Sequence, residues 1–294
     1  MDRVCQNPAM SLTTSLTTRN HDRDSAGMTY VYPVVSRRAG GVSVGINLNP
    51  NNACNWGCIY CQVPDLKRGG PPPIDLALLE AEVRRMLDAI VHGDFMQTRV
   101  PEGMRRLNDV ALSGNGEPTS APEFPAVVGL IGRVLAEFGL LGAIKLVLIT
   151  NGSLSGKARV QAGIRAMAAL NGEVWFKFDR ATRAGLRQAN ATEVDPERHY
   201  QRPKTVAGLC PTWLQACMFA LDGAPPAEPE IAAWLALLAR AVKEAVPLRG
   251  VLLYGLARPS LQTEADRLST LPGGWLEALA QRVEHLGLTV RVNL

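Results

Sequence analysis

The feature that most restricts the fold of this chain is a repeated alternation of short apolar segments with longer amphipathic ones. The short segments have the length of buried strands, and the longer ones repeat apolar residues at helical spacing. The expected strands are residues 42–48, 109–113, 145–150, 174–178, 212–221 and 249–254. The expected helices are residues 75–92, 122–138, 157–170, 229–246 and 274–286. Between them we expect a polar connection over 94–106, a polar region to residue 204 with one helical portion, and a last strand over 288–293.

Strands that alternate with helices in this way predict a parallel sheet with its helices outside. Right-handed crossovers then curl the sheet towards a barrel, and six units fall short of the usual eight. We therefore predict an α/β fold over residues 28–294, a partial (β/α)6 TIM-like barrel with a cysteine loop after its first strand. An open doubly wound sheet is the alternative, but its phosphate-binding glycine fingerprint is missing after the first strand.

Composition and charge restrict the class of protein less than the strand–helix pattern does. Residues 1–27 are polar and show no hydrophobic period, which predicts a disordered arm in which Cys5 has no role. No secretory signal and no membrane-spanning apolar run is evident, so we expect a cytoplasmic protein without membrane contact. The net charge of +4 is compatible with a nucleic-acid partner without requiring one.

Three of the six cysteines lie within eight residues, as Cys54-x3-Cys58-x2-Cys61. Three thiolates on one loop can hold three corners of an iron–sulfur cube and leave the fourth iron open to a small ligand. One alternative is a structural zinc site, which usually takes four protein ligands. Another is a disulfide plus a free thiol, which a reducing compartment disfavours. Cys210 and Cys217 are too few for a second cube, and we expect them mainly in the core.

Further candidates lie where strands end, because parallel barrels place reactive groups at that edge. The second strand ends in Ser-Gly-Asn-Gly-Glu-Pro, residues 113–118. Gly114 and Gly116 would let a ligand approach the backbone, and Glu117 could accept hydrogen bonds from an ammonium group. The alternative is an ordinary turn before a helix.

The later strand ends offer weaker signals. Asn151 and Asp179 can accept hydrogen bonds from hydroxyl groups, and Lys177 could bind a carboxylate. The alternatives are turn chemistry for Asn151 and a simple ion pair between Lys177 and Asp179. Arg258 is a candidate clamp for a substrate anion or a surface cation. Residues 36–38, Ser-Arg-Arg, could reach a phosphate or form a solvated pair.

The cysteine spacing, with Tyr60 directly before the last cysteine, resembles the signature of the radical S-adenosylmethionine (radical SAM) superfamily. Residues 35–38, 45–47 and 113–118 are similar to a branch of iron–sulfur oxidoreductases grouped with the wyosine-forming tRNA enzymes. The likeness covers about residues 30–294. The superfamily's glycine motif usually has two adjacent glycines before Glu, whereas Asn115 separates them here.

The resemblance implies a [4Fe-4S] cluster on the three cysteines and S-adenosyl-L-methionine at the open iron. The residues that it places around this cofactor are Tyr60, Gly114, Gly116, Glu117, Asn151, Lys177 and Asp179. It also implies reductive cleavage to methionine and a 5′-deoxyadenosyl radical, which removes hydrogen from a substrate. The electron would come from a reductant such as flavodoxin or ferredoxin.

The sequence does not identify the substrate. The resemblance suggests a tRNA base, and a peptide, a protein or a small metabolite is the alternative. An iron–sulfur electron carrier or sensor belongs to a different class, although a carrier would not need Glu117 and its glycines.

Overall fold

A curved eight-stranded sheet forms the centre of the protein, in a computed structural model that describes residues 15–17, 26–36 and 40–293. In spatial order its strands are β1 (Val31–Ser36), β2 (Gly41–Asn47), β5 (Leu107–Ser113), β6 (Lys145–Thr150), β7 (Gly172–Lys177), β8 (Thr212–Cys217), β10 (Leu248–Tyr254) and β12 (Val290–Asn293). Strands β2 to β12 run parallel, and β1 pairs antiparallel with β2. In the described residues the edge strands β1 and β12 do not pair, so the sheet is a half-barrel.

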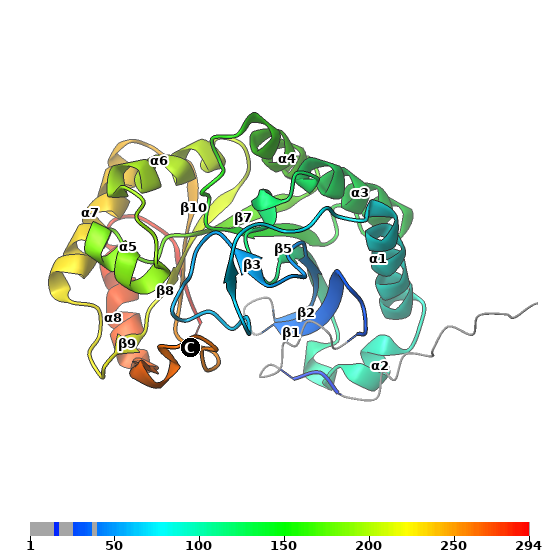
Figure 1. Cartoon of the computed structure of the whole chain (residues 1–294), viewed down its shortest axis with the longest axis horizontal. Coiled ribbons are helices and arrows are strands. Elements are labelled where there is room, and N and C mark those ends of the chain that lie inside the picture. Colours follow the sequence, from blue (N-terminus) through cyan, green and yellow to red (C-terminus); the bar gives the residue numbers. More distant parts are fainter. Residues whose placement is uncertain (1–14, 18–25, 37–39, 294) are drawn as a thin grey trace, which may run out of the picture.

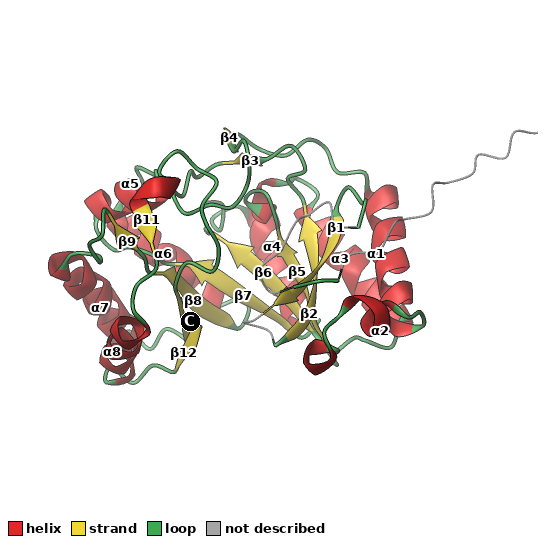
Figure 2. Cartoon of the chain, turned by 90° about the horizontal axis from the view of Figure 1, so that it is seen from below, coloured by secondary structure: helices red, strands yellow, loops and turns green. Residues whose placement is uncertain are grey.

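Helices form an arc outside this sheet, as Figures 1 and 2 show from two directions. The longer ones are α1 (Leu76–Val91), α3 (Phe124–Glu137), α4 (Ala158–Ala168), α6 (Pro196–Ala207), α7 (Glu228–Lys243) and α8 (Gly273–Glu284). The shorter helical segments are α2 (Phe95–Arg99), α5 (Arg183–Asn190) and the 3-10 turns η1 (Glu102–Met104), η2 (Pro118–Ser120) and η3 (Ala265–Arg267). Two small ribbons pair β3 (Ala53–Cys54) with β4 (Lys67–Arg68) and β9 (Ala220–Leu221) with β11 (Leu268–Ser269).

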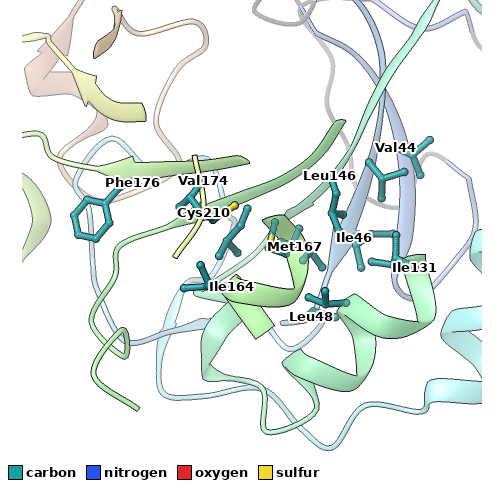
Figure 3. Close-up of a cluster of buried hydrophobic side chains, with 14 of the residues drawn as sticks. Val44, Ile46, Leu48, Ile131, Leu146, Ile164, Met167, Val174, Phe176 and Cys210 are labelled. Atoms are coloured by element: carbon teal, nitrogen blue, oxygen red, sulfur yellow. The ribbon is translucent and has the colours of Figure 1, made fainter. Parts of the chain in front are cut away.

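The main core lies between the sheet and this helical layer. Figure 3 shows Val44 and Ile46 of β2 and Leu146 of β6 near Ile131 of α3 and Met167 of α4, and all five side chains have almost no exposed surface. Alternate positions of a strand face opposite sides of a sheet. Strand β2 therefore sends its branched apolar side chains outward to the helices and keeps small or polar residues on its inner face.

The predicted fold class is confirmed: the structure is an α/β half-barrel of the TIM-like kind. The expected strands correspond to β2, β5, β6, β7, β8 and β10, and the proposed last strand is β12. The α1 helix begins as expected, because the Asp75 carboxylate accepts a hydrogen bond from the backbone N–H of Leu78.

Other expectations about the elements were wrong. Strand β1 was not foreseen, because an antiparallel edge strand has no helix after it to mark its repeat. The segment expected as one strand over 212–221 is two, since β9 leaves the main sheet to pair with β11. The polar region before residue 204 holds two helices, α5 and α6, whose N-caps are Thr182 and Asp195. The connection over 94–106 contains α2 and η1.

Some predictions concern segments at the margins of the described structure. The proposed disordered arm lies mostly outside the described residues, as do Cys5 and the Arg37–Arg38 pair. Within the arm, Leu16 is described and buried, and its N–H donates to the Arg99 carbonyl at 2.8 Å. No described helix combines the length and apolar character that crossing a bilayer requires.

The parallel register brings the carboxyl ends of the strands to one edge. Asn47 of β2 pairs with Ser113 of β5, and Lys177 of β7 pairs with Gln215 of β8. The loops that leave this edge therefore meet above the inner face of the sheet.

Candidate functional site

The cysteine loop lies over the carboxyl edge of the sheet, and its three thiols line one cavity of about 290 Å³. All three cysteines are half-buried and free of disulfides. Helix α5 supports the loop, because the N–H groups of Gly57 and Ile59 donate to the carbonyls of Asn190 and Ala189 at 3.2 and 3.0 Å. The Cys61 N–H closes a turn onto the Cys58 carbonyl at 2.9 Å. The loop is thus held by backbone contacts that leave its thiols facing the cavity.

A second segment, residues 258–262, binds the far end of the cysteine loop. The Cys61 carbonyl accepts hydrogen bonds from the Ser260 hydroxyl, the Leu261 N–H and the Gln262 amide at 3.1, 2.9 and 3.1 Å. Ser260 also donates to the Ile59 carbonyl at 2.7 Å. The 258–262 segment follows β10 in the chain, so these bonds connect the last third of the sequence to the cysteine loop.

Burial is the main influence on the pKa of the Cys54 and Cys58 thiols. It raises the pKa of Cys54 to about 12 and that of Cys58 to about 11, and neighbouring negative charges add to the shift for both. Thiolates are the ligand form of cysteine, so metal binding here must displace protons. Among the described residues, no three His, Cys, Asp or Glu side chains are grouped closely enough to hold one metal ion.

The glycine-rich segment passes directly beneath the cysteine loop. Gly114 has φ = +131°, and a Cβ atom there would lie 2.5 Å from Oδ1 of Asn47. A Cβ atom on Gly116 would lie 2.2 Å from the Ala53 carbonyl oxygen. Both positions therefore require glycine for packing within the fold, and both line the cavity.

Glu117 lines the cavity, but the protein itself satisfies its carboxylate. Oε1 accepts from the Thr119 hydroxyl and the Thr150 hydroxyl, both at 2.6 Å, and Oε2 accepts from the Asn151 N–H at 2.7 Å. Burial raises the pKa of Glu117, while these hydrogen bonds act in the opposite direction. In this structure the carboxylate joins the end of β5 to the end of β6.

Lys177 and Asp179 form a buried pair at the back of the site. Their Nζ and Oδ2 atoms are 3.8 Å apart, and Lys177 Nζ also lies 4.7 Å from the Tyr60 ring centre. Burial opposes the charge on each group, but their attraction prevails: the pKa of Lys177 is raised and that of Asp179 is lowered. Asp179 also accepts from the Tyr60 hydroxyl and, at 2.8 Å, from Asn190.

Most of the residues expected at the site do meet there. The three cysteines, Tyr60, Gly114, Gly116, Glu117, Asn151, Lys177 and Arg258 all line the same cavity. Asp179 does not; it lies beneath the lining with 2% of its surface exposed. Asn151 donates to the Asn55 side chain at 2.8 Å, and Arg258 donates to Gln62 at 2.8 and 2.5 Å.

Sequence reasoning missed several residues of the cavity lining. Gln215 of β8 is 1% exposed, and its Oε1 atom has no hydrogen-bond partner among the described residues. The Oδ1 atom of Asn115 is buried and unpartnered in the same way. An amide within an apolar strand, as in Thr-Trp-Leu-Gln-Ala-Cys, was the available signal for Gln215. Cys217, expected mainly in the core, is buried but also lines the cavity.

Comparison with curated proteins gives a distant relationship. No protein-family model matches the chain. The chain is 29% identical over 134 residues to a UPF0026 protein of Helicobacter pylori strain 26695, and 28% identical to that of strain J99. This alignment covers 45% of the chain and only 38% of the curated relatives it matches.

Comparison with solved structures identifies the fold. TYW1, solved with a lysine-pyruvate adduct bound, superimposes with a TM-score of 0.54 at 15% identity, over 83% of this chain and 73% of that one. A radical SAM methyltransferase from Sphaerobacter thermophilus gives 0.56 at 14% identity, over 90% and 68%. Streptococcus suis SuiB bound to S-adenosylmethionine gives 0.55 at 11% identity, over 87% and 50%.

The protein therefore has the radical SAM fold. Over 45% of its length it is also distantly similar in sequence to the UPF0026 proteins.

Proposed function

We propose that this protein is a radical SAM enzyme, in which Cys54, Cys58 and Cys61 hold a [4Fe-4S] cluster. The observation that carries the proposal is that these three thiols face one cavity, at the carboxyl edge of a radical SAM half-barrel. Gly114 and Gly116 lie against the same cavity, where the backbone of a glycine-rich segment is open to a ligand.

The donor set fits an iron–sulfur cluster better than a single ion. Each iron of a cluster takes one cysteine, so the sulfurs stand apart. Zinc instead needs its ligands within about 2.0–2.3 Å of one point, and no group of described residues is arranged for that. When bound, the cluster and S-adenosylmethionine would supply one-electron reduction and hydrogen abstraction.

The residues of the chain would bind and orient this cofactor and exclude water. The unpartnered amide oxygens of Asn115 and Gln215 can accept hydrogen bonds from ammonium, hydroxyl or amino groups. The Lys177 ammonium, with 18% of its side chain exposed, can attract a carboxylate. Asp179 keeps Lys177 protonated. A protonated lysine is a poor nucleophile, so Lys177 is poorly suited to form a covalent adduct with a carbonyl compound.

The proposal requires a one-electron donor, such as flavodoxin or ferredoxin, and a substrate. The sequence resemblance to the wyosine-forming tRNA enzymes favours a tRNA base. The likeness to SuiB, which has also been solved with its precursor peptide SuiA, favours a peptide as the alternative. Salt-sensitive co-purification of RNA would favour the first, because phosphate contacts weaken steeply with salt. A cluster-based carrier or sensor is the other class, and the unpartnered acceptors in the cavity argue against it.

The test is anaerobic reconstitution with iron and sulfide, reduction with dithionite, addition of S-adenosylmethionine, and detection of 5′-deoxyadenosine. We expect 5′-deoxyadenosine from the native chain and none from a variant with Cys54, Cys58 and Cys61 replaced by Ala. Iron uptake by both proteins, or zinc binding without iron, would overturn the assignment. A cluster that never cleaves S-adenosylmethionine, with or without RNA and peptide fractions, would favour the carrier.

A further inference from the structure

A second cavity, of about 360 Å³, lies beside the candidate active site and is lined by basic and hydroxyl side chains. One wall is the loop over residues 153–157, between β6 and α4. The other wall is one face of α6, where Arg198, Gln201, Arg202 and Thr205 follow one another at helical spacing. We refer to this space as the basic cavity.

The cations of the basic cavity form no ion pairs within the part of the chain that the structure describes. Among the described residues, Lys157, Arg198 and Arg202 form no ion pair, whereas Arg183 and Arg187 nearby pair with Asp195 and Glu193. The Nη1 atom of Arg202 is fully buried without a hydrogen-bond partner in the described chain. The Arg202 side chain as a whole is only half-buried and lines the cavity, so an anion bound there would provide a counter-charge for Arg202 and for the exposed Arg198.

The backbone of the same wall also favours an anion. Helix α4 begins at Ala158, directly after the 153–157 loop, and its N-cap Lys157 makes no side-chain capping bond. The first N–H groups of a helix point outward and carry partial positive charge. The hydroxyl-bearing Ser153 and Ser155 line the cavity next to this helix end. Guanidinium groups and hydroxyls on the lining, next to the positive end of a helix dipole, are the kind of groups that bind phosphate.

The basic cavity shares a wall with the candidate active site. Asn55, the residue after Cys54, donates to the Ser153 hydroxyl at 2.7 Å and accepts from the Asn151 side chain at 2.8 Å. Asn151 lines the cavity of the cysteines, and Ser153 lines the basic one. The charge of Glu117, on the active-site side, also acts on Arg202.

We propose that the basic cavity binds a phosphate group of the substrate, while the reacting part of that substrate enters the cavity of the cysteines. S-adenosylmethionine carries no phosphate, so the cofactor would not fill this site. The role in substrate binding rests on the proposed function, whereas phosphate binding itself does not. A phosphodiester of RNA and a phosphomonoester of a small metabolite present the same chemistry to these donors.

The experiment measures binding to the full-length, iron-free chain by fluorescence anisotropy. The probes are a fluorescent single-stranded RNA oligonucleotide and a fluorescent guanosine 5′-monophosphate, each competed with inorganic phosphate. The variants are Arg198→Gln and Arg202→Gln, and the control is Arg165→Gln, an exposed position on α4 outside the cavity. Thermal unfolding checks that each variant is folded.

We expect Arg198→Gln and Arg202→Gln each to weaken binding about tenfold, and to lower the salt dependence of RNA binding by about one phosphate contact. Arg165→Gln should change neither. Arginine-dependent binding of RNA identifies a phosphodiester, and arginine-dependent binding of the mononucleotide alone identifies a small phosphorylated substrate. No binding of either probe, or equal losses in all three variants, overturns the proposal.

The triple cysteine variant separates this proposal from the proposed function. It should bind the phosphate probes like the native chain while lacking S-adenosylmethionine cleavage. A native chain that binds phosphate through Arg202 but never cleaves S-adenosylmethionine would leave the phosphate site standing and remove the proposed chemistry.

Discussion

Asn190, the last residue of α5, donates a hydrogen bond to the Sγ atom of Cys58 at 3.3 Å. The same amide group donates to Asp179 at 2.8 Å, so it links the cysteine loop to the buried Lys177–Asp179 pair. Hydrogen bonds to cluster sulfurs tune cluster potential, and groups that orient metal ligands affect affinity strongly. Asn190 is therefore a positioning residue for the proposed cluster.

We predict that Asn190→Leu weakens iron retention about tenfold and lowers the cluster's reduction potential, because the Cys58 thiolate loses its hydrogen bond. Iron content during chelator challenge and a potentiometric titration followed by electron paramagnetic resonance measure the two effects. The matched control is Gln188→Leu, an exposed position on the same helix. Identical iron retention and potential in both variants would remove the role assigned to Asn190.

Glu117→Gln should destabilise the iron-free chain by about 2–3 kcal/mol, because one carboxylate oxygen becomes an NH2 group that faces other donors. Urea unfolding measures this change. Glu137→Gln, which removes a surface ion pair with Arg84, should change stability far less than Glu117→Gln, because solvent screens exposed ion pairs. If Glu117→Gln keeps full stability and loses only cofactor binding, the carboxylate serves the ligand and does not join β5 to β6.

Gln215→Leu should instead weaken ligand binding without lowering stability. Its buried Oε1 atom has no partner in the described chain, so an apolar side chain of similar size should leave the unfolding free energy unchanged or higher. Loss of this acceptor should weaken S-adenosylmethionine binding to the reconstituted protein about tenfold, as measured by calorimetry. Gln97→Leu on the surface of α2 should alter neither quantity. Unchanged binding in Gln215→Leu would place this residue outside the ligand site.

The 258–262 segment should be released when its side-chain bonds to the cysteine loop are removed. Each bond contributes about 1 kcal/mol, so Ser260→Ala with Gln262→Ala should speed proteolytic cleavage within the segment and loss of iron. Limited proteolysis with mass spectrometry and an iron-release assay follow both. Thr263→Ala is the control, because its hydroxyl bonds only to the adjacent Glu264. Protection equal to that of the native chain would show that the backbone bond from Leu261 and the bonds between Arg258 and Gln62 suffice.

His199 should make stability depend on pH. Burial lowers its pKa to about 3, Arg202 lowers it further and Asp179 raises it slightly, while its ring stacks on Phe178 at 5.1 Å. The unfolded chain takes up this proton near pH 6.5 and the folded chain does not, so stability falls as pH drops below that value, by about 2 kcal/mol at pH 5.

His199→Phe removes this titration. Relative to the native chain, the variant should therefore gain about 2 kcal/mol more at pH 5 than at pH 8 in urea unfolding. The matched control is His285→Phe, at an exposed position after α8. A native-to-variant difference that is constant across this range would mean that His199 does not titrate on unfolding.

Most of the fold could be predicted from the sequence, because the signals for strands and helices come from residues that are close together in the chain. Periodic apolar residues marked β6 and α1, and Asp75 marked the start of that helix. The polar region before residue 204 was expected to hold one helical portion and holds two helices, α5 and α6, because packing of a few side chains stabilises them, not a broad apolar stripe. Strand β1 is an edge strand that depends on β2 for its partner.

Periodicity and motif spacing are properties of neighbouring residues, so they were enough to predict the half-barrel and the set of thiols and glycines at its carboxyl edge. Which polar groups keep an unused hydrogen-bonding atom follows only from how the chain packs. The packing joins Glu117 to Thr150 and Asn151, buries Asp179 against Tyr60, and leaves Gln215 and Arg202 with atoms that have no partner among the described residues. Hydrogen-bond partners are set by contacts between residues far apart in the chain, and no local pattern encodes them.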